Sequence, residues 1–528
     1  MHHLLSLLIF TPVVAALAAL LIPPTYRTAF RMLSLVVSGF QCIVLYLLLQ
    51  SHSANVEFQN MEKVSWIAFD MGSLGSFQAD YFLGLDGLSV TLVSLSVIIL
   101  LVAVVASWSI EKNVKGYFVL LLILNGAIIG TFCALDLLLF YVFFEFMLLP
   151  MYFLIGIWGG PRREYASIKF FLYTLLGSIL ILVVLIGLYM SVRDPSHPEN
   201  ATHTFNMLSM TDPANFISGS VLDPSNHWTM GPCSARGWAF LFLFVGFGIK
   251  LPIVPLHTWL PDAHVEAPTA ISVVLASLLL KIGAYGLLRL AYPVFPLEAL
   301  QASWLTGLFG VSSILYGAFN ALASKDLKRL IAYSSISHMG FVLLGLASGT
   351  VEGTTGAVYQ LFSHGIISAM LFILAGVLSD RTQDRTIDNY SGLSTTMKSY
   401  AALSMIAFFA SMGLPGFSGF IGEVMILLGA FSSSAVNGLL PKWMAFASAL
   451  GLLLGAAYFI WTIQRMFLGT FSIKIRGVSL PDLGWREYVL LLPLALLTLA
   501  FGIFPQPLLE IISPFAINFV EAIMKIKP

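Results

Sequence analysis

The chain has 528 residues, of which 58% are hydrophobic and only 10% are charged, and its 26 Lys and Arg balance 26 Asp and Glu. A soluble domain contains about 25% charged residues, so this composition excludes a soluble protein and indicates a membrane protein with many spans. The zero net charge gives no reason to expect a nucleic-acid partner.

Apolar runs of about 20 residues predict an all-α polytopic membrane protein. The first run has no basic segment before it and leads straight into further spans, so we expect a retained helix and not a cleaved signal peptide. Two long polar segments, 51–83 and 193–236, interrupt the series, and we expect His197, His203 and His227 to be solvated loop residues. The fourteen predicted helices are 4–22, 29–50, 84–110, 116–134, 136–158, 165–192, 237–252 with a continuation to about 260, 267–290, 300–323, 327–348, 354–379, 399–430 with a break, 443–469 and 486–512.

The placement of Lys and Arg predicts the orientation. With fourteen spans, most basic residues, including the clusters at 162–163, 325–329 and 381–385, fall on one side of the membrane. Cytoplasmic loops are enriched in Lys and Arg, so this side is predicted to be the inner one. Both termini and both long polar segments are then predicted to lie on the outer side of the cell inner membrane.

Two predicted helices contain breaks. Helix 7 breaks at Pro252 and Pro255, and helix 12 breaks at GLPG, 413–416. Interrupted helices at corresponding positions of two halves are typical of transporters built from inverted repeats, and an offset of five spans reverses the orientation. We therefore predict two inverted five-helix repeats, helices 4–8 and 9–13. The predicted domains are residues 1–115, 116–290 for the first repeat, 291–470 for the second repeat, and 471–528.

Six ionisable residues lie near the middle of predicted spans, where a charge costs roughly 2.5–3.5 kcal/mol on insertion scales. Ten residues of helix rise ~15 Å, which is half of a ~30 Å hydrocarbon core. Groups at one depth cannot form a pore straight across the membrane, but they can form a polar line parallel to its plane. The six residues are Glu145, Lys250, Lys281, His338, His364 and Glu423.

These residue types suit proton transfer. A buried lysine is easier to deprotonate than one in water, and a nearby carboxylate reverses this effect. We therefore interpret Glu145 and Lys250 as a switch pair and Lys281 as the central site. Histidine titrates near neutrality, so His338 and His364 are interpreted as relays and Glu423 as the terminal site.

Structural roles are the alternative for each group. Glu145 could be a buried acid that bonds to a backbone or hydroxyl group, and the lysines could form structural ion pairs. The two histidines could be satisfied core residues. Polar residues at the inner end of helix 7 are expected to cap helices or line an interface, and they are His257, Asp262, His264 and Glu266. Asp136 is expected to cap a helix start.

Three motifs resemble the antiporter-like proton-channel subunits of respiratory complex I: KLPIVPLHTWLPDAHVEAPT, SKDLKRLIAYSSISHMGF and GLPGFSGFIGE. The resemblance covers nearly the whole chain, and Glu423 stands where sister chains and Mrp-type antiporter chains usually have lysine. The resemblance implies the roles given above for the six residues. It also implies transfer of one proton per catalytic cycle, driven by quinone reduction in other subunits, with other membrane-arm and peripheral-arm subunits as partners.

Cys42, Cys133 and Cys233 are far apart and form no C-x-x-C motif, so we expect no cofactor and no metal in this chain. We expect a non-redox subunit of an NADH-quinone oxidoreductase that is inactive alone. A chain of an Mrp-type cation/proton antiporter or of a membrane-bound hydrogenase is the main alternative, and a self-contained solute transporter is another. A scaffold without transport does not explain six ionisable groups at mid-depth.

Overall fold

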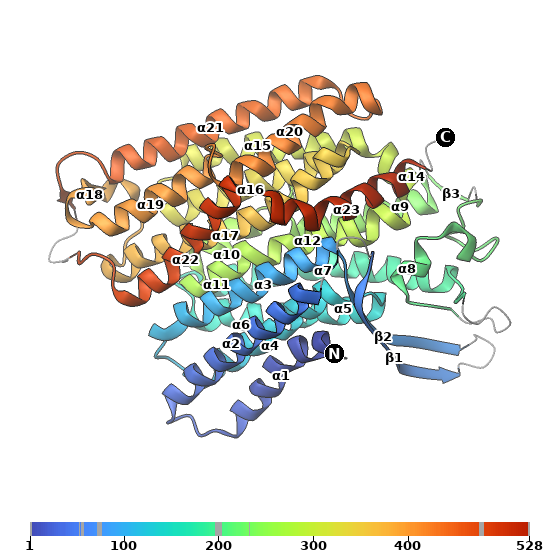
Figure 1. Cartoon of the computed structure of the whole chain (residues 1–528), viewed down its shortest axis with the longest axis horizontal. Coiled ribbons are helices and arrows are strands. Elements are labelled where there is room, and N and C mark those ends of the chain that lie inside the picture. Colours follow the sequence, from blue (N-terminus) through green and yellow to red (C-terminus); the bar gives the residue numbers. More distant parts are fainter. Residues whose placement is uncertain are drawn as a thin grey trace.

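The fold is known from a computed structural model that describes residues 3–51, 53, 57–70, 76–195, 203–226, 228–231, 233–474 and 480–525. Within these residues, fourteen helices are long and apolar enough to cross a membrane, which confirms the predicted class. Their number equals the predicted one, although the two sets differ at helix 7 and at the C-terminus. The chain runs broadly from α1 (Leu4–Leu21) at one side of the bundle to α21 (Lys442–Met466) at the opposite side (Figure 1). The last two helices cross back over the middle of the bundle, against α3 and α17.

The first part of the bundle follows the predicted spans closely. The predicted helix 136–158 is divided at Met147, because Pro150 has no N–H to donate to the carbonyl four residues earlier. The elements are α2 (Arg27–Ser51), α3 (Gly87–Ala106), η2 (Ser107–Ser109), α4 (Val114–Cys133), α5 (Leu137–Phe146), α6 (Leu148–Trp158) and α7 (Arg163–Ser191).

Both predicted helix breaks are confirmed. The first separates α9 (Ala235–Lys250) from α10 (Trp259–Glu266), and Pro252 and Pro255 lie between them. The second separates α19 (Lys398–Ser411) from α20 (Ser418–Val436). Gly413 and Gly416 have φ of +70° and +96° there, a conformation that glycine adopts without steric cost.

The span between the two halves is not a regular α-helix. Two π-helical segments, η4 (Leu275–Leu279) and η5 (Leu287–Ala291), interrupt it. Between and beside them lie α11 (Thr269–Val274), α12 (Leu280–Gly286) and α13 (Tyr292–Val294). π-Helical turns are rare, and where they occur they are frequently found at functional sites.

The second half consists mainly of long helices. The elements are α14 (Pro296–Gln301), α15 (Ser303–Ala323), α16 (Leu327–Ala347), α17 (Val351–Thr382), η6 (Ile387–Asn389) and α18 (Leu393–Thr396). A short antiparallel pair, β5 (Tyr390–Ser391) and β6 (Ser472–Ile473), joins the loop after α17 to the loop after α21.

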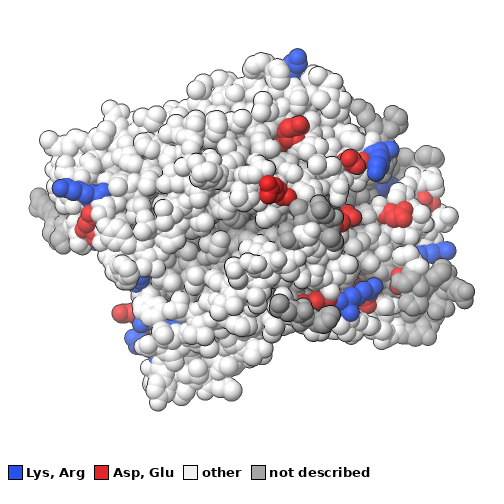
Figure 2. Space-filling view, viewed as in Figure 1, with Lys and Arg blue, Asp and Glu red and all other residues white. Residues whose placement is uncertain are grey.

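The core lies around three helices that are almost wholly enclosed by others. These spans are Thr269–Val294, Leu327–Ala347 and Val351–Thr382, whereas peripheral helices such as α2 and α21 keep apolar side chains exposed, as lipid contact requires. On the face seen in Figure 2, most charged side chains gather toward the two ends of the bundle, and a broad uncharged surface lies between them.

The two long polar segments differ in structure. Much of 51–83 forms a hairpin of β1 (Gln59–Asp70) and β2 (Ser76–Leu85), whose Glu62 accepts the backbone N–H of Leu5 at 2.8 Å. The described part of 193–236 contains α8 (Met207–Met210), η3 (Pro213–Asn215), β3 (Thr229–Met230) and β4 (Cys233–Ser234). His203 is half-buried, and His197 and His227 lie outside the described residues.

The C-terminal region differs from the single helix predicted over 486–512. The structure has two helices, α22 (Trp485–Ile503) and α23 (Gln506–Met524). Phe504 has φ −123° and ψ 72°, because the residue before a proline is driven out of the helical region, and Pro505 follows it. α23 is therefore one of the fourteen apolar helices, whereas each half of broken helix 7 is too short to be among them.

Candidate functional site

Lys281 and His364 are in direct contact in the core. Lys281 comes from α12 and is 0% exposed, and its Nζ lies 2.8 Å from Nδ1 of His364 on α17. The same Nζ donates a hydrogen bond of 2.7 Å to the carbonyl of Ala276. This carbonyl belongs to the π-helical segment η4, five residues before the lysine, so the side chain is folded back along its own helix. The predicted central site is thus joined directly to one of the predicted relays.

His338 and Glu423 form the second contact. Nδ1 of His338, on α16, lies 3.0 Å from Oε1 of Glu423, on α20, and both side chains are buried. Nε2 of His338 lies 3.3 Å from the hydroxyl of Ser411, the last residue of α19. The ring is therefore held between the two halves of the second broken helix.

The two contacts are adjacent. The rings of His338 and His364 have their centroids 5.3 Å apart. Lys281, His364, His338 and Glu423 thus form one continuous buried series, contributed by α12, α17, α16 and α20. Four of the six residues predicted from the sequence are brought together, with the two histidines between Lys281 and Glu423; the order of the histidines was not predicted.

Glycines at the second break make room for Glu423. A Cβ on Gly413 would lie 2.2 Å from Oε2 of Glu423, and the positive φ of Gly413 disfavours any other residue. A Cβ on Gly422 would lie 2.6 Å from Oε1 of Gln360. The glycines in GLPGFSGFIGE therefore allow close packing around Glu423.

Gln360 was missed by the sequence analysis. It is buried on α17, and its Nε2 lies 3.4 Å from Glu423 Oε1 and 3.5 Å from His338 Nδ1. Its Oε1 is buried and has no hydrogen-bond partner among the described residues. The sequence does contain a signal for Gln360, because this amide interrupts the long apolar run of α17 one turn before His364.

Lys250 lies at the first break. It is the last residue of α9 and is buried, and its Nζ donates a hydrogen bond of 3.2 Å to the carbonyl of Phe144. The ammonium group also lies 3.1 Å from the centroid of the Phe144 ring, as in a cation–π contact. The α-helix ends here because Pro252 and Pro255 follow, so the break fixes the depth of the lysine.

The predicted pair of Glu145 and Lys250 is not closed in this structure. Glu145 lies in the last turn of α5 and is half-buried at the edge of the chain, whereas Lys250 is enclosed. The two groups interact electrostatically, but within the described part of the chain no direct ion pair joins them. Glu145 is therefore partly accessible from the surface of the subunit, unlike the other five candidate residues.

The polar series is interrupted between Lys250 and Lys281. Lys250 forms a hydrogen bond to Phe144. Lys281 forms its hydrogen bonds to Ala276 and His364, so the two lysines share no partner. α9 and α12 pack closely there, since a Cβ on Gly286 would lie 2.2 Å from the ring of Phe247. A proton that crosses this gap needs bridging water or a movement of the helices.

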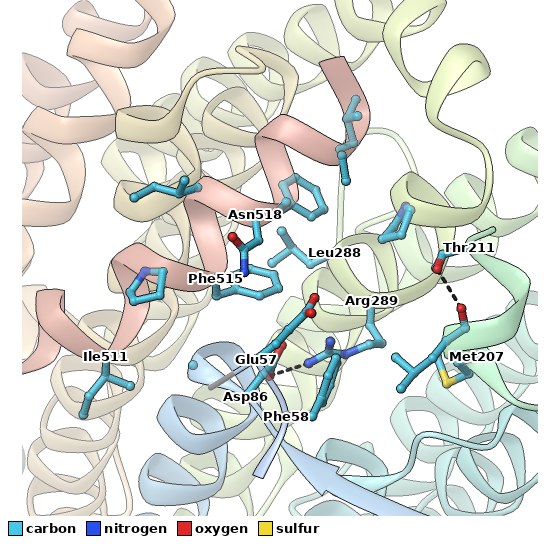
Figure 3. Close-up of a pocket in the computed structure, with 18 residues that line it drawn as sticks. Glu57, Phe58, Asp86, Met207, Thr211, Leu288, Arg289, Ile511, Phe515 and Asn518 are labelled. Carbon is cyan, nitrogen blue, oxygen red and sulfur yellow. Dashed lines mark hydrogen bonds and ion pairs between the residues drawn. The ribbon is translucent and has the colours of Figure 1, made fainter. Parts of the chain in front are cut away.

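A third buried cation lies at the other end of the central span. Arg289, in η5, donates from Nη2 to Oδ1 of Asp86 at 2.5 Å and to the hydroxyl of Ser89 at 3.1 Å. Tyr285 accepts from its Nε at 3.3 Å. Figure 3 shows this ion pair at the wall of a cavity of about 730 Å³ between the hairpin and α23, lined also by Glu57, Phe515 and Asn518. Its enclosed partners give Arg289 a structural role.

We expect Arg289→Met to destabilise the chain by about 3–5 kcal/mol, because it leaves the buried carboxylate of Asp86 without a counter-charge. Thermal unfolding of the purified complex, monitored through the release of this subunit, measures the loss of stability. The double variant Arg289→Met/Asp86→Asn keeps an N-cap acceptor for α3 and removes the lone charge. It should recover most of the lost stability, and no recovery would contradict this assignment.

The other polar residues at the end of helix 7 agree in part with their predicted structural roles. Asp262 forms an ion pair of 2.7 Å with Lys169 of α7, and Glu266 accepts the backbone N–H of Arg162 at 2.9 Å. Asp136 accepts the N–H of Leu139 at 3.0 Å and caps α5 as predicted. His264 has no such role.

Comparisons with known proteins agree with the geometry. The family described as NADH:quinone oxidoreductase/Mrp antiporter matches residues 134–451, which contain all six candidate residues. The NADH-quinone oxidoreductase subunit M of Rhodobacter capsulatus is 38% identical over 527 residues, covering 99% of this chain and 97% of the relative. This chain belongs to the NADH:quinone oxidoreductase/Mrp antiporter family. Membership makes it a multi-pass membrane protein and one subunit of a larger membrane complex.

One further relative and two solved structures agree with this finding. The NADH-ubiquinone oxidoreductase chain 4 of Chondrus crispus is 36% identical over 516 residues, covering 97% of this chain and 96% of the relative. A chain of respiratory complex I from Thermus thermophilus has a TM-score of 0.82 at 32% identity, over 98% of this chain and 99% of that one. The Mrp complex from Dietzia has a TM-score of 0.80 at 20% identity, over 99% of this chain and 100% of that one, and shows the shared fold.

Proposed function

We propose that this chain is a proton-translocating membrane-arm subunit of an NADH-quinone oxidoreductase, of the subunit M or chain 4 type. Its full-length similarity to relatives of that type supports the assignment. The resemblance described above also implies it, because Glu423 stands where sister chains usually have lysine. The observation that carries the transport function is the buried series from Lys281 to Glu423. The redox reaction is assigned to other subunits, so the isolated chain is inactive.

The geometry supports transfer in single steps. A protonated Lys281 can donate to Nδ1 of His364, which lies within hydrogen-bond distance. The two imidazole rings then exchange a proton through their adjacent edges or one bridging water, and His338 delivers it to the carboxylate of Glu423. Because the series lies in the enclosed core, a charge on one group acts strongly on the next group.

Glu145 connects this series to the rest of the complex. A half-exposed carboxylate at mid-depth is costly against lipid, so a neighbouring subunit has to cover it. A change of charge or distance at that interface alters the electrostatic interaction of Glu145 with Lys250. In this way the effect of a distant redox reaction on the interface reaches the charge of the lysines. Both termini of the chain are predicted to lie on the outer side of the membrane.

A chain of an Mrp-type antiporter is the second candidate, because the same fold is shared with the Mrp complex. Purification of the complex from its native membrane through a tag on this chain separates the two. We expect subunits with iron–sulfur and flavin sites, and NADH-driven acidification of proteoliposomes. Purification with only antiporter chains, or cation transport by this chain alone, would contradict the proposal.

We expect Lys250→Ala to remove most proton pumping while the complex still assembles. The alanine leaves only the carbonyl of Phe144 without a donor, which costs about 1–3 kcal/mol. Glu145→Gln should have the same effect on pumping, because it removes the charge that acts on Lys250. Proton uptake by reconstituted vesicles during NADH oxidation measures both variants. Normal pumping in either one would exclude that residue from the mechanism.

A further inference from the structure

His264 is enclosed but is bonded to nothing. It lies in α10, the short second half of the first broken helix, and is 0% exposed. Neither of its ring nitrogens has a hydrogen-bond partner among the described residues. Buried polar groups are normally paired, and an unpaired one requires an explanation such as a functional role or a bound water.

The ring is held by stacking and not by polar contacts. It lies flat on Phe372 of α17, with centroids 4.5 Å apart and planes at 11°. Phenylalanine would make the same apolar contact, so packing does not account for the two nitrogens at this position. Packing therefore explains an aromatic ring at this position, but it does not explain why the ring is an imidazole.

The charged and titratable groups that act on His264 come from three helices. Lys328 at the start of α16, Lys281 of α12 and His364 of α17 all interact with it electrostatically. Nζ of Lys328 donates to the carbonyl of Ala267 at 3.0 Å, three residues after His264. His264 thus lies between Lys328, at the predicted inner end of the bundle, and the central lysine.

The side chain of Lys281 extends toward the same end. Its bond to Ala276 directs the ammonium group back along the central span, toward the start of that span at Thr269 and the adjoining end of α10. The neighbouring end of α10 is bound by basic residues of the predicted inner surface, Arg162 and Arg385. A route from that surface to Lys281 therefore passes the ring of His264.

We propose that His264 is a proton-uptake residue that passes protons from the predicted inner face to Lys281. The inference rests on the proposed pumping function and adds the path by which the central lysine is reloaded. One ring nitrogen accepts a proton through water beside Lys328, and the other nitrogen releases its own proton through water to neutral Lys281. A 180° rotation of the ring restores the starting tautomer, so the ring neither gains nor loses a proton over the cycle.

The test uses the assembled complex in proteoliposomes, with His264→Phe and His264→Gln compared in the same preparation. Phenylalanine keeps the stacking on Phe372, and glutamine keeps a polar group that cannot relay a proton in this way. We expect both to lower the protons pumped per NADH oxidised to the value of Lys281→Ala. His257→Phe is the matched control, since His257 is a buried histidine at the same helix break whose ring meets Tyr316 edge to face, and it should pump normally.

The outcomes separate this inference from the proposed function. Lys281→Ala without pumping, together with a native ratio in His264→Phe or His264→Gln, would overturn the role of His264 alone. Normal pumping in Lys281→Ala would overturn the proposed function itself. A relay also predicts that the solvent isotope effect on pumping in D2O is lost in His264→Gln, and that the His264→Gln/Lys281→Ala double variant is no worse than Lys281→Ala. An additive loss in the double variant would indicate a structural role and would contradict the relay.

Discussion

Replacing Lys281 with methionine is expected to lower proton pumping by about 10²-fold, the low end of what a positioned proton-transfer group contributes. Methionine fills most of the space of the lysine stem and removes a charge that is costly to bury. The carbonyl of Ala276 and Nδ1 of His364 lose their donor, at about 1–3 kcal/mol each, which an assembled complex can tolerate. Vesicle acidification, measured against the rate of NADH oxidation, gives the size of the effect.

Lys281→Arg is the control that separates charge from proton exchange. Arginine keeps the positive charge but does not release a proton in a protein, so it should fail as completely as methionine. Native pumping in Lys281→Arg would mean that only the charge matters, and it would contradict proton transfer through Lys281. Lys281→Ala should behave like methionine.

Replacing Glu423 with glutamine is expected to reduce pumping by a similar factor of about 10². Glutamine preserves the size and the contacts with Gln360, but it cannot take up the proton that His338 delivers from 3.0 Å. The assembled complex should have normal thermal stability, because a buried carboxylate is replaced with an uncharged group of the same shape. Pumping and stability are measured on the same reconstituted preparation.

Glu423→Lys is the informative companion to that variant. A lysine there would face Nδ1 of His338 as Lys281 faces Nδ1 of His364, at 2.8 Å, so a second Lys–His contact would form. We expect pumping within about tenfold of the native complex, since lysine still exchanges protons. A Lys variant as inactive as the Gln variant would show that the two residue types are not interchangeable at this position.

The sequence predicted those residues of the site that stand out by their depth in a membrane span. Lys250, Lys281 and Glu423 stand out because a charge in an apolar run has to be enclosed, and the structure encloses all three. Proline and glycine marked both helix breaks for the same kind of local reason. These features follow from the cost of exposing a charge or a backbone group to hydrocarbon, and this cost can be read along a single segment.

The features that were missed depend on contacts between segments. The exposure of Glu145 follows from the packing of α5 at the edge of the chain, and no pattern in its own helix indicates it. Gln360 matters because α16 and α20 bring His338 and Glu423 to it. The end of α22 at Phe504 was a local signal, since Pro505 and Pro507 follow, but the apolar run continues through it and concealed the break.

The length of α17 links the separate contacts. Its 32 residues extend ~48 Å against a ~30 Å hydrocarbon core, and its side chains are buried from Gly353 to Leu378. Gln360, His364 and Phe372 lie on this one rod and touch Glu423, Lys281 and His264, respectively. A rotation or tilt of α17 would therefore change the contacts of His264, Lys281 and Glu423 in a single movement.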